Sequence, residues 1–184
     1  MSPESARSRK IDVPPGRVAE SLEVHACPVV LRRVEGPGAR EVYLHCQPPA
    51  DVLDASGQSE AIYRAICDLM EADGGAAQGG SLGLVVAETV FLRDLPSNIA
   101  PVRAARERVF AADGGTAHSP ATTEIEQPPL NERACLEVMI HAVVPYDASH
   151  RIERVEASPI CGCAECARVH GLALRIGEET RFHA

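Results

Sequence analysis

The sequence predicts an α+β fold, in which a mixed β-sheet has two helices packed on one face. A helical pattern over residues 54–72 is followed by a glycine-rich loop, the apolar stretch LVVAETVFLRDL at 84–95, and a second helical pattern. A helix, a buried strand and another helix give one helical layer on one sheet. The 184 residues are enough for one domain, which we place at 18–145, between a flexible arm at 1–17 and an extension at 146–184.

Composition excludes several classes of function. The net charge of −8 argues against non-specific binding to phosphate backbones, and three Phe, three Tyr and no Trp give few platforms for stacking bases. No apolar run reaches the roughly 20 residues of a membrane helix, and the N-terminus has no apolar signal core. We therefore expect a cytoplasmic protein with no nucleic-acid or membrane partner, whose seven cysteines are reduced thiols or metal ligands.

Two strands are expected before the first helix. They are Pro28–Val34 and Glu41–Gln47, and the sequence EGPGAR between them has the composition of a turn. In the second strand, Val42, Leu44 and Cys46 alternate with polar or aromatic residues, as in a half-buried strand. The proline pair that follows ends this strand.

The first helix is predicted over Asp54–Ala72. Its apolar residues fall at i, i+4, i+7 and i+8, which is one face of a helix: Ile62, Ile66, Leu69 and Met70. Candidates for the residue that caps its N-terminus are Asp54, Ser56 and Ser59. The glycine pairs that follow are not a phosphate loop, because no Gly-Lys-Ser/Thr comes after them.

The stretch at 84–95 is predicted to be a central strand. It is apolar on both faces, which is typical of a strand covered on both sides. The second helix is then expected to begin at Ser97 or Asn98 and to end near Phe110, with Pro101 tolerated in its first turn.

Two further strands complete the predicted domain. The first, Thr122–Glu126, is short and polar, and the second, Ala134–Val144, is more apolar and is closed by Pro145. Two strands, a helix, a strand, a helix and two strands describe a sheet with both helices on one side.

Several short segments within residues 28–145, taken in order, resemble segments of a known protein family. They are SEAIYRAICDLMEADGG, VVAETVFLRDL, NIAPVRAARERVF and SPATTEIEQPPLNERACLEVMIHAVV. These are similar to the first helix, the "VVKTTVFL-D" strand, the second helix and the last two strands of the Rid (YjgF-like) reactive-intermediate deaminases. The resemblance implies a YjgF/chorismate-mutase-like fold, a homotrimer with pockets between its subunits, and hydrolysis of small enamines or imines to a carbonyl compound and ammonia.

Two residues depart from the family pattern. The family's ligand-binding arginine follows a Pro-Ala pair, and here Thr122 follows Pro120-Ala121. A hydroxyl cannot replace the bidentate clamp of a guanidinium on a carboxylate. The family's late glutamate, which positions water, corresponds to Met139, which cannot relay a proton.

Three functions remain open from the sequence. The first is a divergent Rid-type hydrolase or deaminase acting on a small uncharged or cyclic intermediate, with candidate pocket residues Thr122, Glu124, Glu137 and His118. The second is a trimer that binds a small ligand or a partner without catalysis. The third is a metal-dependent enzyme that uses a cysteine site in the C-terminal extension. No organic cofactor is expected.

The C-terminal extension contains a Cys/His cluster. Three thiolates and one imidazole within ten residues are a plausible tetrahedral zinc set, although iron remains an alternative: Cys161, Cys163, Cys166 and His170. The rival interpretation is a tail whose thiols bind nothing. Residues 146–184 hold few large apolar side chains, so we expect a structural Zn²⁺ to order them.

The remaining cysteines and histidines have simpler interpretations. Four cysteines lie in apolar strands or a helix and are interpreted as small core residues: Cys27, Cys46, Cys67 and Cys135. His25, His45 and His141 fall in or beside predicted strands and are interpreted as structural.

Overall fold

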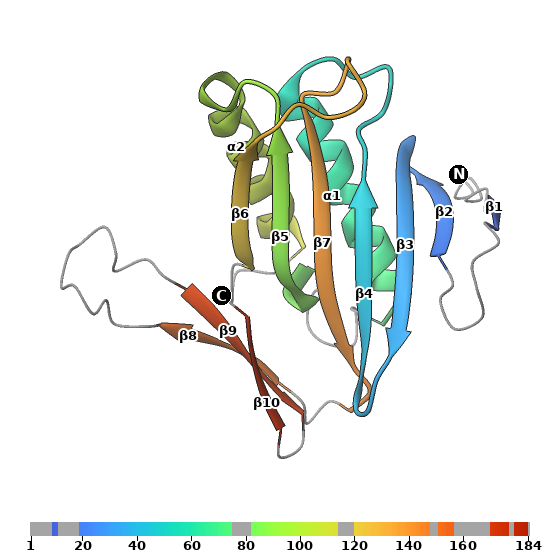
Figure 1. The fold of residues 1–184 in the computed structure, drawn as a ribbon, viewed down its shortest axis with the longest axis vertical. Coiled ribbons are helices and arrows are strands. Elements are labelled where there is room, and N and C mark those ends of the chain that lie inside the picture. The colour runs from blue at the N-terminus through green and yellow to red at the C-terminus, as the bar shows by residue number, and fades with distance from the viewer. Residues whose placement is uncertain are drawn as a thin grey trace.

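The structure, a computed structural model, describes residues 9–10, 19–74, 82–113, 120–147, 151–156, 170–176 and 179–183. Most of these residues belong to one seven-stranded sheet, ordered β1-β2-β3-β4-β7-β5-β6 (Figure 1). Its strands are β1 (Arg9–Lys10), β2 (Ala19–Val24), β3 (Cys27–Glu35), β4 (Ala39–Cys46), β5 (Val85–Leu92), β6 (Ala121–Glu126) and β7 (Leu136–Pro145).

The sheet is mixed, because β5 and β6 are parallel and every other pair of neighbours is antiparallel. The last strand of the sheet in the chain, β7, lies between β4 and β5 and pairs with both. The expected strands are present, with β3 and β4 each starting one or two residues earlier than predicted.

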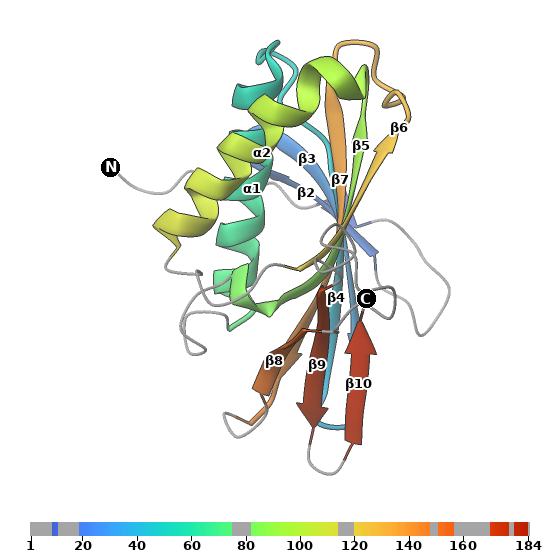
Figure 2. The same cartoon turned by 90° about the vertical axis from the view of Figure 1, so that its left-hand side faces the viewer.

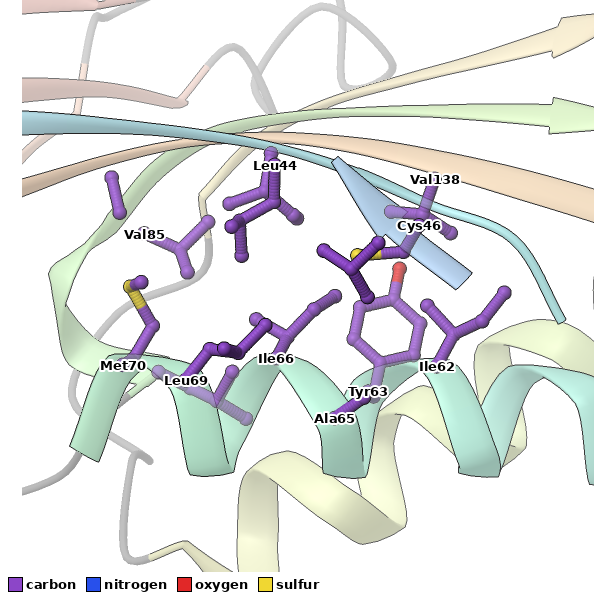
Figure 3. Close-up of a cluster of buried hydrophobic side chains, with 14 of the residues drawn as sticks. Leu44, Cys46, Ile62, Tyr63, Ala65, Ile66, Leu69, Met70, Val85 and Val138 are labelled. Carbon is purple, nitrogen blue, oxygen red and sulfur yellow. The ribbon is translucent and has the colours of Figure 1, made fainter. Parts of the chain in front are cut away.

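Two helices, α1 (Ala55–Ala72) and α2 (Leu95–Ala112), cover one face of this sheet (Figure 2). The α+β architecture with both helices on one face is therefore confirmed. The apolar stripe of α1 packs on the sheet, where Ile62 and Ile66 lie beneath Leu44, Cys46 and Val138 (Figure 3). These side chains are all less than 3% exposed, which makes this layer the core.

The other face of the seven-stranded sheet is here called the open face. Several large apolar side chains alternate onto it from β3, β4, β6 and β7, and they are 36–48% exposed: Val30, Val34, Tyr43, Ile125 and Met139. The sheet therefore has one face buried by helices and one that is apolar without cover from the described residues.

The prediction for residues 84–95 was wrong in two respects. Only Val85–Leu92 form the strand, because Leu82–Leu84 form a 3₁₀ turn and α2 begins at Leu95. The strand is also second from the edge, and only one of its faces is covered by helices. The pairing register shifts between Val85 and Ala87, so two consecutive residues are buried, and the alternation in the sequence is hidden.

The helix starts differ in how well the sequence predicted them. Asp54 caps α1, because its Oδ1 accepts a hydrogen bond from the backbone N–H of Gly57 at 2.8 Å. Asp54 is one of the three residues predicted as candidates for this cap. Helix α2 is present as predicted, but its predicted start was wrong. The flanking residue is Asp94, in the left-handed region at φ 50°, and Ser97 and Pro101 lie inside the helix.

The extension contains strands that the sequence analysis did not predict. They are β8 (Arg151–Glu156), β9 (His170–Ile176) and β10 (Glu179–His183), and they form an antiparallel three-stranded sheet in the order β10-β9-β8 (Figure 1). In the predicted arm at 1–17, only β1 is described, and it pairs with β2. None of the described helices is both long enough and apolar enough to cross a membrane.

Candidate functional site

A buried polar cluster lies between the helices and the sheet and is centred on Glu88 of β5. Glu88 has no exposed side-chain surface, and its Oε1 contacts Nη2 of Arg106 on α2 at 2.6 Å. The same oxygen accepts a hydrogen bond from Oγ1 of Thr122 at 2.7 Å, and Oε2 accepts one from the hydroxyl of Tyr63 at 3.0 Å. One carboxylate therefore links α1, α2, β5 and β6.

Burial sets the electrostatics of this cluster. Burial and the adjacent charge of Glu88 raise the pKa of Tyr63 well above its ordinary value, so its hydroxyl remains a donor. Burial alone would lower the pKa of Arg106, but the charges of Glu88 and Tyr63 more than offset this, and its pKa is raised. The Arg106 guanidinium also lies 4.3 Å from the ring centre of Phe110, a cation–π contact.

Glu124, the second predicted pocket residue on β6, is paired with an arginine of α2. Its Oε1 accepts a hydrogen bond from Nε of Arg103 at 2.8 Å, and its other oxygen pairs with the same guanidinium. The Glu124 side chain is 18% exposed and that of Arg103 is 58% exposed. Thr122 and Glu124 therefore lie on the helix-covered side of β6, where the side chain of each already has a hydrogen-bond partner.

Glu137, on β7, lies on the open face. Its Oε2 is 3.1 Å from Nε2 of His45 on β4, and its Oε1 accepts a hydrogen bond from Nε2 of Gln47 at 3.2 Å. The side chain of Glu137 is 8% exposed and that of His45 is 36% exposed. A buried carboxylate thus holds one nitrogen of a partly exposed imidazole.

The predicted pocket residues are therefore not brought together within one chain. Thr122 and Glu124 face the helices, Glu137 faces the other way, and His118 lies outside the described residues. Met139 is on the open face, 48% exposed, two residues along β7 from Glu137. A pocket that used both sets of residues would need a second subunit.

His45 was expected from the sequence to be structural, and its pairing with Glu137 was missed. The two residues are 92 positions apart, and no local pattern links them. Strand alternation offered a partial clue, because His45 and Tyr43 share one face of β4. On the same face, the ring of Tyr43 stacks on the ring of His141, with ring centres 4.5 Å apart.

The cysteines of the sheet behave as core residues. Cys27 and Cys46 are fully buried, as predicted, and burial raises the pKa of Cys27 to about 12 and also raises that of Cys46. Cys67 and Cys135 are only partly buried. Their burial and raised pKa make Cys27 and Cys46 poor candidates for metal binding or nucleophilic chemistry.

The predicted metal ligands lie largely outside what the structure describes. This holds for Cys161, Cys163 and Cys166, whereas His170 is the first residue of β9. Residue Glu156, at the end of β8, pairs with His170, so the segment 157–169 connects two adjacent strand ends. Among the described residues, no group of three His, Cys, Asp or Glu side chains could hold a metal ion.

A groove of about 390 Å³ lies between α1 and α2, and its lining includes none of the predicted pocket residues. Its lining includes Glu60, Arg64, Asp68 and Arg108. Glu60 pairs with both arginines, and the other charged residues of the lining are acidic: Asp68, Glu71 and Asp113.

No protein-family model matches the sequence, and no curated protein matches it. Solved structures do match. TdcF from E. coli with bound serine is 20% identical over 60% of this chain and 84% of that chain, with a TM-score of 0.49. The YjgF gene product from E. coli is 24% identical over 60% and 84%, with a TM-score of 0.46.

A member of the YjgF protein family from Neisseria meningitidis is also similar, at 18% identity over 77% of this chain and 98% of that chain, with a TM-score of 0.42. Proteins of the YjgF family are thus among the solved structures to which this chain is similar. At these identities and TM-scores the likeness assigns neither a family nor a chemistry to this chain.

Proposed function

We propose that this chain is a divergent Rid-like protein. It binds a small uncharged imine or enamine in pockets between the subunits of a homotrimer and hydrolyses it to a carbonyl compound and ammonia. The observation that carries the proposal is the order of the family-like segments, which fall one after another on elements of a single α+β layer. They coincide with α1, β5, α2 and the pair β6–β7.

The contacts of Thr122 support an uncharged substrate. Where the family pattern has an arginine, this chain has a hydroxyl that donates to Glu88, and Glu88 is already paired with Arg106. The Thr122 hydroxyl and the Arg106 guanidinium are both already paired with Glu88, so neither is available to bind a substrate carboxylate. A pocket without that cation favours substrates that carry no negative charge.

The first prediction is a homotrimer in which the open face is buried. Fully burying an exposed large apolar side chain contributes about 1.5–3 kcal/mol, and five side chains that are still 36–48% exposed here would each gain part of that on assembly. Replacing Val30, which is 42% exposed, with glutamate puts a charge into this surface and should dissociate the assembly. Light scattering of dilute protein should give the mass of three chains for the parent and of one chain for Val30→Glu.

Leu130→Glu is the matched control for this prediction. Leu130 is 93% exposed in the loop between β6 and β7, outside the open face, and its replacement should leave the mass unchanged. A parent protein that is monomeric in dilute solution would contradict the trimer and the inter-subunit pocket together.

The second prediction concerns substrate charge. Losing a charged partner at a carboxylate site costs about 2–5 kcal/mol, equivalent to a factor of tens to thousands in affinity. Imines without a carboxylate, generated in situ by an amine oxidase, should therefore release ammonia faster with the protein than without it. Carboxylated 2-imino acids, generated by an amino-acid oxidase, should show at least a tenfold lower kcat/KM by the same ammonia assay.

Two outcomes of this assay are informative against the proposal. Equal turnover of both imine classes would show that a carboxylate is accommodated without the family arginine. No acceleration of either class would leave the trimer as a non-catalytic ligand-binding or partner-binding protein.

A further inference from the structure

We propose that His45 and Glu137 form a proton-transfer pair on the open face, with His45 as the base. For its natural substrate, the inference rests on the proposed hydrolysis of an uncharged imine. The pair itself is argued from geometry and can be tested with a probe that is unrelated to imines.

Strand pairing brings the two side chains together. His45 of β4 is directly opposite Met139 of β7, and Glu137 is two residues along β7, so all three side chains project from the same face. Diagonal neighbours of this kind lie close enough for long side chains to meet. The resulting distance from Nε2 of His45 to Oε2 of Glu137 is 3.1 Å.

The carboxylate of Glu137 is fixed before any substrate arrives. It is 8% exposed, and its second oxygen accepts the hydrogen bond from Gln47 at 3.2 Å. No arginine or lysine side chain of the described residues pairs with it. The Glu137 carboxylate is therefore directed at the imidazole, where it orients the ring.

The opposite nitrogen of His45 is the reactive one. When Nε2 of the neutral ring donates to Glu137, Nδ1 is an acceptor, and the described residues give Nδ1 no hydrogen-bond partner. The His45 side chain is 36% exposed in the single chain, and the proposed pocket between subunits would give a small molecule access to it. A carboxylate, an oriented imidazole and an accessible acceptor nitrogen are the parts required of a general base.

The side chains directly opposite His45 on the two neighbouring strands are apolar, and titratable groups lie diagonal to it. Val30 of β3 and Met139 of β7 flank it directly, and both are apolar. The charged or titratable groups diagonal to it are Arg32 on β3 and Glu137 and His141 on β7, while Tyr43 precedes it by two residues on β4 and Gln47 follows just after the strand. Among the described residues, the hydrogen-bond partner of the His45 ring is the side chain of Glu137.

The corresponding step with an imine is balanced in atoms and charge. His45 takes a proton from water while the water oxygen bonds to the imine carbon and the C=N pair moves to nitrogen, which takes up a proton from solvent. The imidazolium then gives its proton to the departing nitrogen as the C–N bond breaks, and the hydroxyl oxygen forms the C=O bond and releases its proton to solvent. The products are a carbonyl compound and ammonia, and His45 is restored.

The experiment uses 5-nitrobenzisoxazole, an uncharged probe of positioned bases. A base removes its C–H proton, the electron pair forms the nitrile, the N–O bond breaks, and the coloured phenolate is released. The full-length parent should accelerate this elimination, and His45→Ala should lose about 10²-fold or more of that acceleration. Glu137→Gln should lose part of it, because the ring is no longer held by a charge.

His141→Ala is the matched control, since His141 is on the same face and lies 3.4 Å from Glu41 rather than Glu137. It should keep the parent rate. Added imidazole should restore elimination to His45→Ala above the rate with imidazole alone, which a merely structural role would not produce. Thermal unfolding and light scattering check that the variants fold and assemble as the parent does.

An unchanged rate in His45→Ala, or an equal loss in His141→Ala, would overturn the proton-transfer pair. The imine assay separates this result from the proposed function. Imine hydrolysis that survives in His45→Ala would retain the function and remove His45 from it. Probe elimination that depends on His45, without imine hydrolysis by the parent, would retain the pair and remove the substrate class.

Discussion

Replacing Arg106 with leucine is expected to lower the free energy of unfolding by about 3–5 kcal/mol, because it leaves the buried Glu88 carboxylate without its cation. The Glu88 side chain has no exposed surface, and that of Arg106 is only 14% exposed. The variant also removes the cation that packs against Phe110. Urea unfolding at fixed protein concentration measures the change, since an oligomer's stability depends on concentration.

Arg103→Leu is the control, one helical turn before Arg106 and paired with Glu124. Its side chain is 58% exposed, so its loss should cost about 1 kcal/mol or less. The double variant Glu88→Gln, Arg106→Leu should recover a large part of the loss, because the unpaired charge is gone while an acceptor remains for Tyr63. Equal costs for Arg103→Leu and Arg106→Leu would show that burial does not decide the strength of these pairs.

The second large effect concerns the C-terminal extension. We propose that Cys161, Cys163, Cys166 and His170 bind one Zn²⁺ per chain. The pairing of Glu156 with His170 supports this, because it holds the two ends of the segment 157–169 next to each other. Structural zinc contributes about 10–16 kcal/mol in small peptides, so removing it should strongly destabilise the extension.

Elemental analysis of protein purified without chelator should find one zinc per chain, and a Cys163→Ser, Cys166→Ser variant should lose it. Chelation should make the extension sensitive to protease before the seven-stranded sheet is cleaved. Binding should weaken as pH falls, because the thiolate and imidazole ligands must be deprotonated. Cys67→Ser, Cys135→Ser is the control. A parent protein with no stoichiometric transition metal would leave the thiols unliganded.

The sequence predicted elements best where periodicity was strong and failed where turn chemistry was unusual. α1 was found because its apolar face repeats with the helical period and Asp54 caps it. β2 was missed because it joins β3 through His25 and Ala26, which both have positive φ, at 51° and 58°. Such two-residue turns normally carry Asn or Gly, so the usual sequence pattern of a hairpin is absent.

The candidate site was only partly predictable for a different reason. Glu137 was identified, but its partner His45 could not be, since the contact depends on how β7 inserts beside β4. Thr122 was also identified from a motif, yet the direction of its side chain follows from its parallel register with Glu88 on β5. A motif gives the residue and its neighbours in the chain, whereas the face on which it lies is a property of the sheet.

The position of β7 has a consequence for protein synthesis. The strands β1–β4 and the pair β5–β6 contact each other through β7, which is made after all of them. Until residue 145 has left the ribosome tunnel, the nascent chain holds two incomplete half-sheets, and the inner edges of β4 and β5 both lack their partner. We therefore expect ribosome-bound chains that stop before β7 to depend on chaperones, and chains that extend past it to fold cooperatively.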